Sequence, residues 1–172
     1  LMQHANHPNI IKLYEIFYAT SSIPTTHLEF AMVMELVPSK ELYVWWKDHP
    51  KPKLSDVATI YRNIFQALNY MVNDHPQKPV VHRDMKQQNV LVVNEWTAGN
   101  QDEVAKLIDF GFAKSGSEGS AVQTQLGTPT YMAPEVGNPK LREKQSEYGH
   151  DGKCDVWSVG VMMYEMLVGR TP

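Results

Sequence analysis

Acidic, amide and basic side chains follow one another in the middle of the chain in an order that suits group transfer. Residues 82–89 read HRDMKQQN, residues 109–111 read DFG, and residues 133–135 read APE. Asp84 offers a carboxylate that can act as a base, and Lys86 offers a positive charge two residues later. Asn89 and Asp109 offer the oxygen ligands that Mg²⁺ prefers in proteins. Together these side chains predict phosphoryl transfer from a nucleotide, which depends mainly on positioning and charge stabilisation.

Each of these segments has an ordinary structural explanation when it is taken alone. A DFG sequence is common in turns, and an HRD sequence often forms a cluster of paired charges at the surface. Here the three segments occur in order, and short apolar runs at residues 80–81, 90–93 and 105–108 flank them. Coincidence is therefore a poor explanation of the whole set. The seven histidines, by contrast, show no metal-ligand spacing.

The composition limits the classes of protein to which the chain can belong. With 172 residues, 42% of them hydrophobic, the chain can bury one ordinary core and is expected to form one domain. A formal net charge of −3 argues against nucleic-acid binding. Cys154 is the single cysteine, which excludes an intrachain disulfide and fits an intracellular, cytoplasmic location. The most apolar stretch, residues 156–168, is interrupted by Ser158 and Glu165 and is too short to span a bilayer, so it predicts a core helix.

The elements that position these side chains are predicted to be a strand pair followed by a mainly helical body. Strands are predicted at residues 10–17, 30–36, 80–81, 90–93 and 105–108, and helices at residues 41–46, 55–75 and 154–168. Residues 20–26 have the composition of a hairpin loop, and residues 94–103 form a polar loop. Ser55 and Asp56 are expected to cap the long helix, and Gly169 is expected to end the last one.

The ordered segments resemble the catalytic domain of eukaryotic protein kinases, and the resemblance runs from Asn6 to Pro172. It implies an α+β, two-lobed fold of which this chain carries a part. Residues 1–37 would be the remnant of the small lobe with the hinge, and residues 38–172 an incomplete large lobe. The family's glycine-rich loop and ATP-binding lysine would precede Leu1. The resemblance therefore implies a fragment that folds poorly and has little activity by itself.

The resemblance also implies the reaction and its cofactors. ATP with Mg²⁺ would be the phosphate donor, and a serine or threonine hydroxyl of a protein substrate would be the acceptor. Asp84 matches the family's catalytic base, and Lys86 matches the lysine that serine/threonine kinases place against the γ-phosphate. Asn89 and Asp109 match the Mg²⁺ ligands, and Asp109 thereby also binds the nucleotide phosphates.

Further residues would hold the nucleotide base and sugar. Met34 falls at the position that precedes the hinge, and the backbones of Glu35 and Val37 would bond to adenine. Glu41 would lie near the ribose or near a basic substrate residue, and Leu91 would pack beneath the adenine ring. Without the resemblance, residues 34–41 would be interpreted as an ordinary strand that leads to a helix, and Leu91 as a core residue.

Regulation and support of the catalytic segment are implied as well. Arg83 marks the class of kinases controlled by activation-loop phosphorylation, and Thr124 would accept that phosphate from an upstream kinase and bond to Arg83. Thr128 supports serine/threonine specificity. Asp155 would hold the backbone of the HRD segment, and His82 would pack beside Phe110. Competing phosphate acceptors are Ser115, Ser117 and Ser120.

Sequence details favour the calmodulin-dependent-kinase-like group. These are KLIDFGFAK at residues 106–114 and KCDVWS at residues 153–158. A non-catalytic, pseudokinase-like binding module is the alternative from another functional class. Retention of Asp84, Asn89 and Asp109 weighs against it, since pseudokinases typically lose the base or the metal ligand. A small-molecule kinase is disfavoured by residues 127–135, which resemble a platform for peptide substrates.

Overall fold

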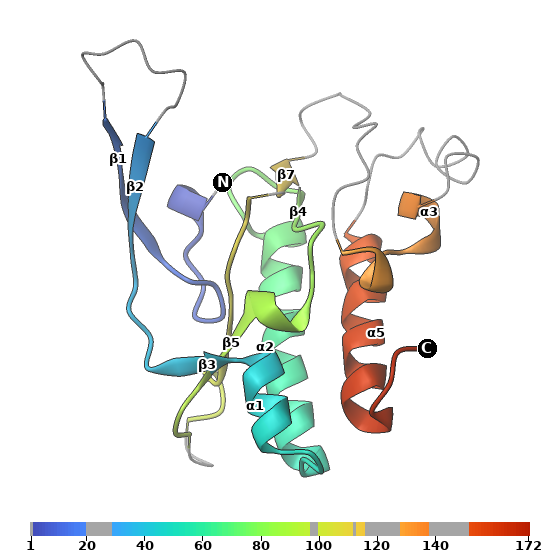
Figure 1. Ribbon diagram of the computed structural model, residues 1–172. Helices are drawn as coiled ribbons and strands as arrows, with labels where there is room; N and C mark the ends of the chain where they lie inside the picture. Colours follow the sequence, from blue (N-terminus) through green and yellow to red (C-terminus); the bar gives the residue numbers. More distant parts are fainter. Residues whose placement is uncertain (1, 20–28, 97–99, 112, 116–127, 138–151) are drawn as a thin grey trace.

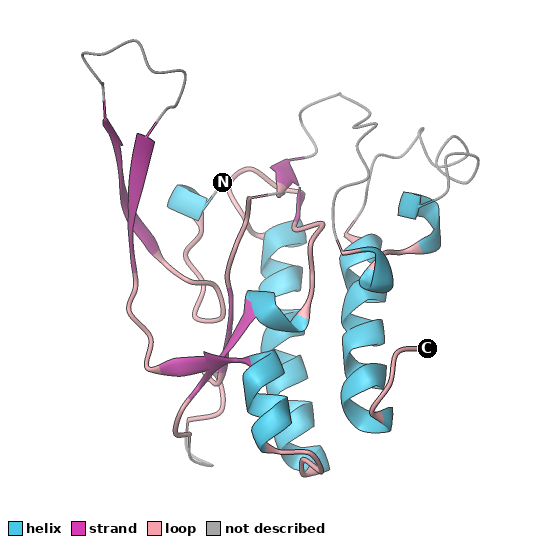
Figure 2. Cartoon of the chain, in the orientation of Figure 1, coloured by secondary structure: helices cyan, strands magenta, loops and turns pink. Residues whose placement is uncertain are grey.

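An antiparallel ribbon stands at one edge of the molecule, and a helical body with small sheets forms the rest (Figure 1). The computed structural model describes all residues except 1, 20–28, 97–99, 112, 116–127 and 138–151. Figure 2 shows strands both in the ribbon and in small sheets beside the helices, and this mixture of strands and helices confirms the expected α+β class. The predicted hairpin loop at residues 20–26 lies outside the described residues.

The ribbon consists of β1 (Leu13–Ala19) and β2 (Glu29–Met34), paired antiparallel from Leu13 opposite Met34 onward. The predicted first strand began at Ile10, and this start is wrong. Ile10 and Ile11 are buried and bridge Leu107 instead, with the Ile11 N–H donating to the Leu107 carbonyl at 2.9 Å. Large apolar side chains of the ribbon remain exposed, as expected for two strands without a covering layer: Tyr14, Phe17, Tyr18, Phe30 and Met32.

Two small sheets hold the segments between the helices. β3 (Ser39–Glu41), β5 (Val90–Val93) and β6 (Ala105–Leu107) form an antiparallel sheet in the order β3-β5-β6. β4 (Val80–Val81) pairs with β7 (Lys114–Ser115). The strands at residues 80–81, 90–93 and 105–107 follow the prediction, whereas β3 and β7 were not foreseen. Single-turn 3₁₀ helices lie at Met2–His4, Gln87–Asn89 and Pro129–Tyr131.

The helices are α1 (Leu42–Asp48), α2 (Leu54–Asn73), α3 (Pro134–Gly137) and α5 (Lys153–Val168). The predicted cap of α2 is wrong, because Lys53 occupies the N-cap position without a side-chain hydrogen bond. The Ser55 hydroxyl donates to the Asp56 carboxylate at 3.3 Å instead. Gly169 ends α5 as predicted, with a φ of 83° that favours glycine.

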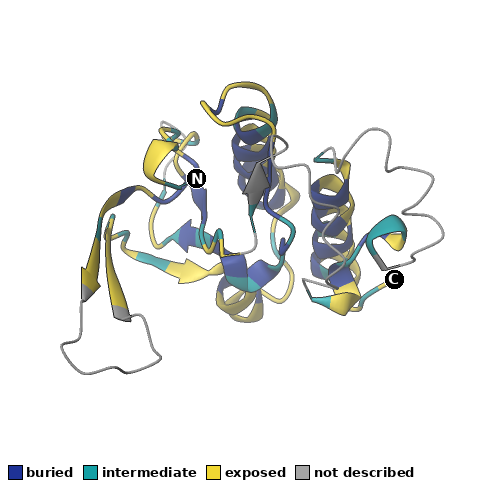
Figure 3. Ribbon diagram, turned by 90° about the horizontal axis from the view of Figure 1, so that it is seen from above, coloured by how far each residue is buried: buried dark blue, intermediate teal, exposed yellow. Residues whose placement is uncertain are grey.

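The core lies between the helices and the small sheets (Figure 3). α2 buries the helical stripe that contains Ile60, Ile64 and Met71. Trp45 and Trp46 of α1 are both buried, so their role is packing. α5 is buried along one side only, since Trp157, Leu167 and other apolar side chains are exposed. No helix in the described part of the chain is long and apolar enough to cross a membrane.

Candidate active site

The HRD segment runs from β4 to β5, and the buried carboxylate of Asp155 on α5 holds it in place. Asp155 accepts hydrogen bonds from the backbone N–H groups of His82, at 2.7 Å, and Arg83, at 2.8 Å. Burial raises the pKa of the Asp155 carboxyl, and the neighbouring His82 and Arg83 oppose that shift. Arg83 has a φ of 67°, a left-handed conformation that non-glycine residues adopt only when their surroundings impose it. The predicted backbone-holding role of Asp155 is confirmed.

The Asp84 carboxylate is the centre of the site, and each of its oxygens accepts two hydrogen bonds. Oδ1 accepts from the backbone N–H of Thr128 at 3.1 Å and from its hydroxyl at 3.2 Å. Oδ2 accepts from the Lys86 ammonium at 2.7 Å and from the Asn89 amide nitrogen at 3.2 Å. The structure therefore brings Asp84, Lys86, Asn89 and Thr128 together, with the carboxylate fixed in one orientation.

Asn89 and Asp109 flank the same end of the ladder between β5 and β6. Val90 pairs with Leu107, and the Ile108 N–H donates to the Asn89 carbonyl at 3.0 Å. The amide nitrogen of Asn89 is also bonded to the Asp84 carbonyl at 2.8 Å, so its side-chain oxygen is the atom suited to a metal ion. Asp109 is exposed, with a φ of 59°, and accepts from the Gly111 N–H at 3.2 Å.

This donor set fits Mg²⁺ better than a metal that needs a complete protein cage. The described residues contain no group of three or more His, Cys, Asp or Glu side chains that could hold an ion. Mg²⁺ is typically bound by one or two protein oxygens, while waters and substrate phosphates fill its remaining positions. Asn89 and Asp109 can supply that number of ligands.

His82 links the HRD and DFG segments from within the core. Its ring is fully buried, lies 4.9 Å from the Phe110 ring between centroids, and has Nε2 3.1 Å from the Ile108 carbonyl oxygen. The predicted packing of His82 beside Phe110 is confirmed. Because both segments touch this histidine, the positions of Asp84 and Asp109 are coupled through it.

A cavity of about 720 Å³ opens between the ribbon and the DFG segment. Three of the residues predicted to bind the nucleotide, Glu35, Leu91 and Asp109, line it together with Met34. Val37, Glu41 and Lys86 are not among its lining residues, although Glu41 pairs with Leu91 across β3 and β5. Apolar side chains from the ribbon and from the segments beside β6 form most of its wall: Ile11, Leu13, Ile16, Phe30, Met32, Ile108 and Phe110. Such a cavity suits a flat heterocycle with a phosphate tail directed toward Asp109.

The predicted phosphate acceptors lie largely beyond the described residues. Thr124, Ser117 and Ser120 fall within residues 116–127, so the expected contact between a Thr124 phosphate and Arg83 stays a prediction. Ser115 belongs to β7, where its backbone pairs with Val80.

A polar cluster beneath the HRD segment was missed by the sequence interpretation. The Glu165 carboxylate accepts from the Gln87 amide at 2.9 Å and from the Tyr131 hydroxyl at 2.8 Å. The Ser158 hydroxyl donates to the Tyr131 carbonyl at 2.7 Å. Burial raises the pKa of the Tyr131 phenol, and its hydrogen bond to Glu165 adds to the shift. The available signal was that Ser158 and Glu165 are the polar interruptions of an apolar helix.

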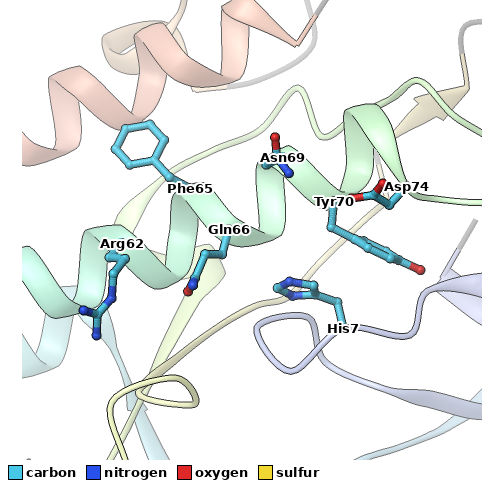
Figure 4. Close-up of a pocket in the computed structure, with 7 residues that line it drawn as sticks. All are labelled: His7, Arg62, Phe65, Gln66, Asn69, Tyr70 and Asp74. Atoms are coloured by element: carbon cyan, nitrogen blue, oxygen red, sulfur yellow. The ribbon is translucent and has the colours of Figure 1, made fainter.

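A second cavity, of about 510 Å³, lies on α2 away from these residues (Figure 4). Figure 4 shows His7 beside Tyr70, and their ring centroids are 5.0 Å apart. The Tyr70 hydroxyl also accepts from the Asn6 N–H at 3.0 Å. This contact anchors the segment before β1 to the long helix, and that segment in turn touches β6.

Burial of His7 is expected to make the stability of the protein depend on pH. Burial lowers the pKa of His7 below its ordinary 6.5, the charge of Lys106 lowers it further, and Asp74 partly offsets both. Below pH 6.5 the unfolded chain then binds more protons than the folded one, so stability falls as the pH drops from 6.5 toward the lowered pKa. We expect His7→Gln to reduce this loss, measured as urea midpoints of the full-length protein at about pH 7.5 and about pH 5.5. His4→Gln, at an exposed position, should keep the wild-type difference, and an unchanged difference in His7→Gln would contradict this prediction.

Comparison with known proteins agrees with this geometry. A family model described as "Protein kinase domain" matches residues 1–172. The chain is 34% identical to calcium-dependent protein kinase 5 of Plasmodium berghei over 172 residues, which are 100% of this chain and 26% of that protein. It is 33% identical to calcium-dependent protein kinase 5 of Plasmodium falciparum, with the same coverage.

A probable myosin light chain kinase of Dictyostelium discoideum is 34% identical over 167 residues, which are 97% of this chain and 46% of that protein. The chain thus spans between about a quarter and just under a half of these relatives. The predicted resemblance to the calmodulin-dependent-kinase-like group is confirmed by the names of these relatives and by the family model.

Proposed function

The chain belongs to the protein kinase domain family, and we propose that its protein transfers the γ-phosphate of ATP to serine and threonine hydroxyls of protein substrates. One observation carries the proposal above others. The Asp84 carboxylate is fixed by Lys86, Asn89 and Thr128. Asp84 precedes β5, and β5 pairs with β6, the strand that leads to Asp109 and the cavity.

Each residue of the candidate site has a distinct role in the proposed reaction. Asp84 orients the acceptor hydroxyl and takes its proton as the phosphoryl group is transferred. Lys86 places a positive charge beside Asp84, where the γ-phosphate would lie. Asn89 and Asp109 hold Mg²⁺, which neutralises charge on the phosphates when it is bound. Leu91 and the backbones of Glu35 and Val37 receive adenine, and Glu41 lies near the ribose or a basic residue of the substrate.

Thr128 connects the acceptor site to the catalytic segment. Its hydroxyl and its backbone N–H both donate to the Asp84 carboxylate, so the chain at residue 128 is fixed relative to the proposed base. Residues 127–135 would then present the peptide substrate to Asp84. We propose an upstream kinase that phosphorylates Thr124, with Arg83 as the partner of the phosphate.

The same arrangement supports a proposed division of the chain into two lobes. We propose that residues 1–37 belong to the small lobe and the hinge, and residues 38–172 to the large lobe. The ribbon of β1 and β2 forms one side of the cavity, while Leu91 of β5, Ile108 and the DFG segment form the other, as nucleotide binding between two lobes would require.

The 172-residue polypeptide alone is proposed to have little activity. The ribbon that lines the cavity exposes Tyr14, Phe17 and Phe30, and isolated two-stranded ribbons are marginally stable in water. We expect this polypeptide to transfer phosphate at less than about one hundredth of the rate of the full-length protein. Comparison of initial rates at equal molar concentration measures this, and equal rates would contradict it.

The proposed function is tested by acceptor specificity. The full-length protein is incubated with γ-labelled ATP, Mg²⁺ and three peptide libraries that differ only in whether serine, threonine or tyrosine is the acceptor. We expect label on serine and threonine peptides and at least about tenfold less on tyrosine peptides. ATP binding without transfer to any library would favour a pseudokinase-like binding module, and preferred transfer to tyrosine would overturn the proposed specificity.

A further inference from the structure

Lys106 joins three segments that are far apart in the sequence. Its ammonium forms an ion pair with the Glu35 carboxylate at 3.0 Å and donates to the Pro8 carbonyl at 2.6 Å. The side chain of Lys106 is 9% exposed and that of Glu35 is 26% exposed, so the pair is largely shielded from solvent. Interactions of this kind are strong, and loss of one partner is costly because it leaves the other charge poorly solvated.

Glu35 is also held by hydrogen bonds with the backbone of Lys12. The Lys12 N–H donates to Glu35 Oε2 at 3.2 Å, and the Glu35 N–H donates to the Lys12 carbonyl at 2.8 Å. Side chain and backbone are therefore both fixed at the first residue after β2. Since Glu35 lines the 720 Å³ cavity, these contacts determine where that part of the cavity wall lies.

Lys106 belongs to the strand that leads to the opposite side of the same cavity. It lies on β6, pairs with Leu91 in the β5 ladder, and precedes Asp109 by three residues. The segment around Pro8 is bonded to β6 as well, because the Leu107 N–H donates to the Asn9 carbonyl at 2.8 Å. The Lys106 ion pair therefore links the Glu35 side chain directly to β6, which pairs with the strand that carries Leu91.

We propose that Lys106 is a positioning residue for the nucleotide: its ion pair with Glu35 fixes the hinge backbone relative to Leu91 and the strand leading to Asp109. This inference rests on the proposed function, since it takes the cavity as the ATP site. Without the ammonium, Glu35 keeps the Lys12 N–H but loses its counter-charge, and its carboxylate turns toward water. The Glu35 backbone then moves within the cavity wall, so adenine binds less tightly, while the Asp84 site keeps its hydrogen bonds.

The test is Lys106→Met in the full-length protein, which keeps the length of the side chain and removes its charge. We expect KM for ATP and the ATP dissociation constant from calorimetry to rise roughly tenfold, with kcat within about twofold of wild type. Lys106→Arg keeps the charge and should restore most of the affinity. In the double variant with Glu35→Gln, the rise should be no larger than in Lys106→Met alone, because both changes remove the same pair.

Lys40→Met is the matched control, since Lys40 forms an exposed ion pair with Asp48 at 2.6 Å and should leave KM for ATP unchanged. A lower kcat and melting temperature with unchanged ATP affinity in Lys106→Met would assign a purely structural role and overturn the inference. If the wild type binds ATP but transfers no phosphate, the proposed function fails while the calorimetric comparison still tests Lys106. Absence of ATP binding by the wild type would overturn both.

Discussion

Replacement of Asp84 by asparagine in the full-length protein is expected to lower kcat by a factor of roughly 10²–10⁴, with KM for ATP within about threefold of wild type. Asparagine cannot take the proton of the acceptor hydroxyl. Its amide also presents hydrogen-bond donors where Lys86 and Thr128 now donate to a carboxylate. None of the described residues that line the cavity forms a hydrogen bond with the Asp84 carboxylate, so KM for ATP is expected to change little.

Initial rates over a range of ATP concentrations measure both parameters, and circular dichroism shows whether the variant is folded. Asp48→Asn is the matched control, since Asp48 is an exposed carboxylate that also pairs with a lysine. It should keep the wild-type rate. A folded Asp84→Asn variant with at least half of the wild-type kcat would exclude Asp84 as the base.

Replacement of Asp155 by alanine is expected to have the largest effect on stability. The carboxylate is almost fully buried and accepts from the backbone N–H groups of His82 and Arg83. Its removal leaves one buried and one part-buried N–H group without their acceptor, at a cost of about 1–3 kcal/mol each, or roughly 2–6 kcal/mol in total. Arg83 would also lose the contact that holds its left-handed backbone, so the Asp84 carboxylate would no longer be fixed in place.

Urea unfolding of the full-length protein measures this loss, and the kinase assay below the unfolding range measures the accompanying loss of rate. Asp48→Ala removes an exposed carboxylate and should leave the unfolding midpoint nearly unchanged. A midpoint for Asp155→Ala equal to that of Asp48→Ala would show that the two backbone bonds contribute nothing.

Elements with strong local patterns were predictable from the sequence. The apolar stripe of α2 gave its position to within two residues, and Gly169 marked the end of α5. The runs at residues 80–81 and 90–93 became β4 and β5, because short runs rich in β-branched residues between turns form buried strands. The run at residues 105–108 became β6 although β6 itself has no β-branched residue. β3 was not predictable in this way, since its polar residues become a strand only by pairing with β5.

The site could be predicted as a set of residues but not as a geometry. The contact of Thr128 with Asp84 spans 44 positions, and that of Asp155 with His82 spans 73. Lys106 and Pro8 are 98 positions apart. Local periodicity carries no information about such distances, and the roles of Thr128 and Asp155 came from the family resemblance. The family resemblance suggested no role for Glu165 or Lys106, so their contacts are known only from the structure.

The central proposal is that Asp84 and Asp109 act together in one phosphoryl-transfer site, and transfer by variants of both residues tests it most directly. The measurement is single-turnover transfer of γ-labelled phosphate from saturating ATP and Mg²⁺ to a serine peptide by the full-length protein. Wild type, Asp84→Asn, Asp109→Asn and the double variant are compared. We expect transfer by the wild type and losses of at least about 100-fold in each single variant. The double variant should be within about tenfold of the slower single variant, because the effects of residues that act as a unit are not additive. Near-wild-type transfer by either single variant, or fully multiplicative losses in the double variant, would contradict this proposal.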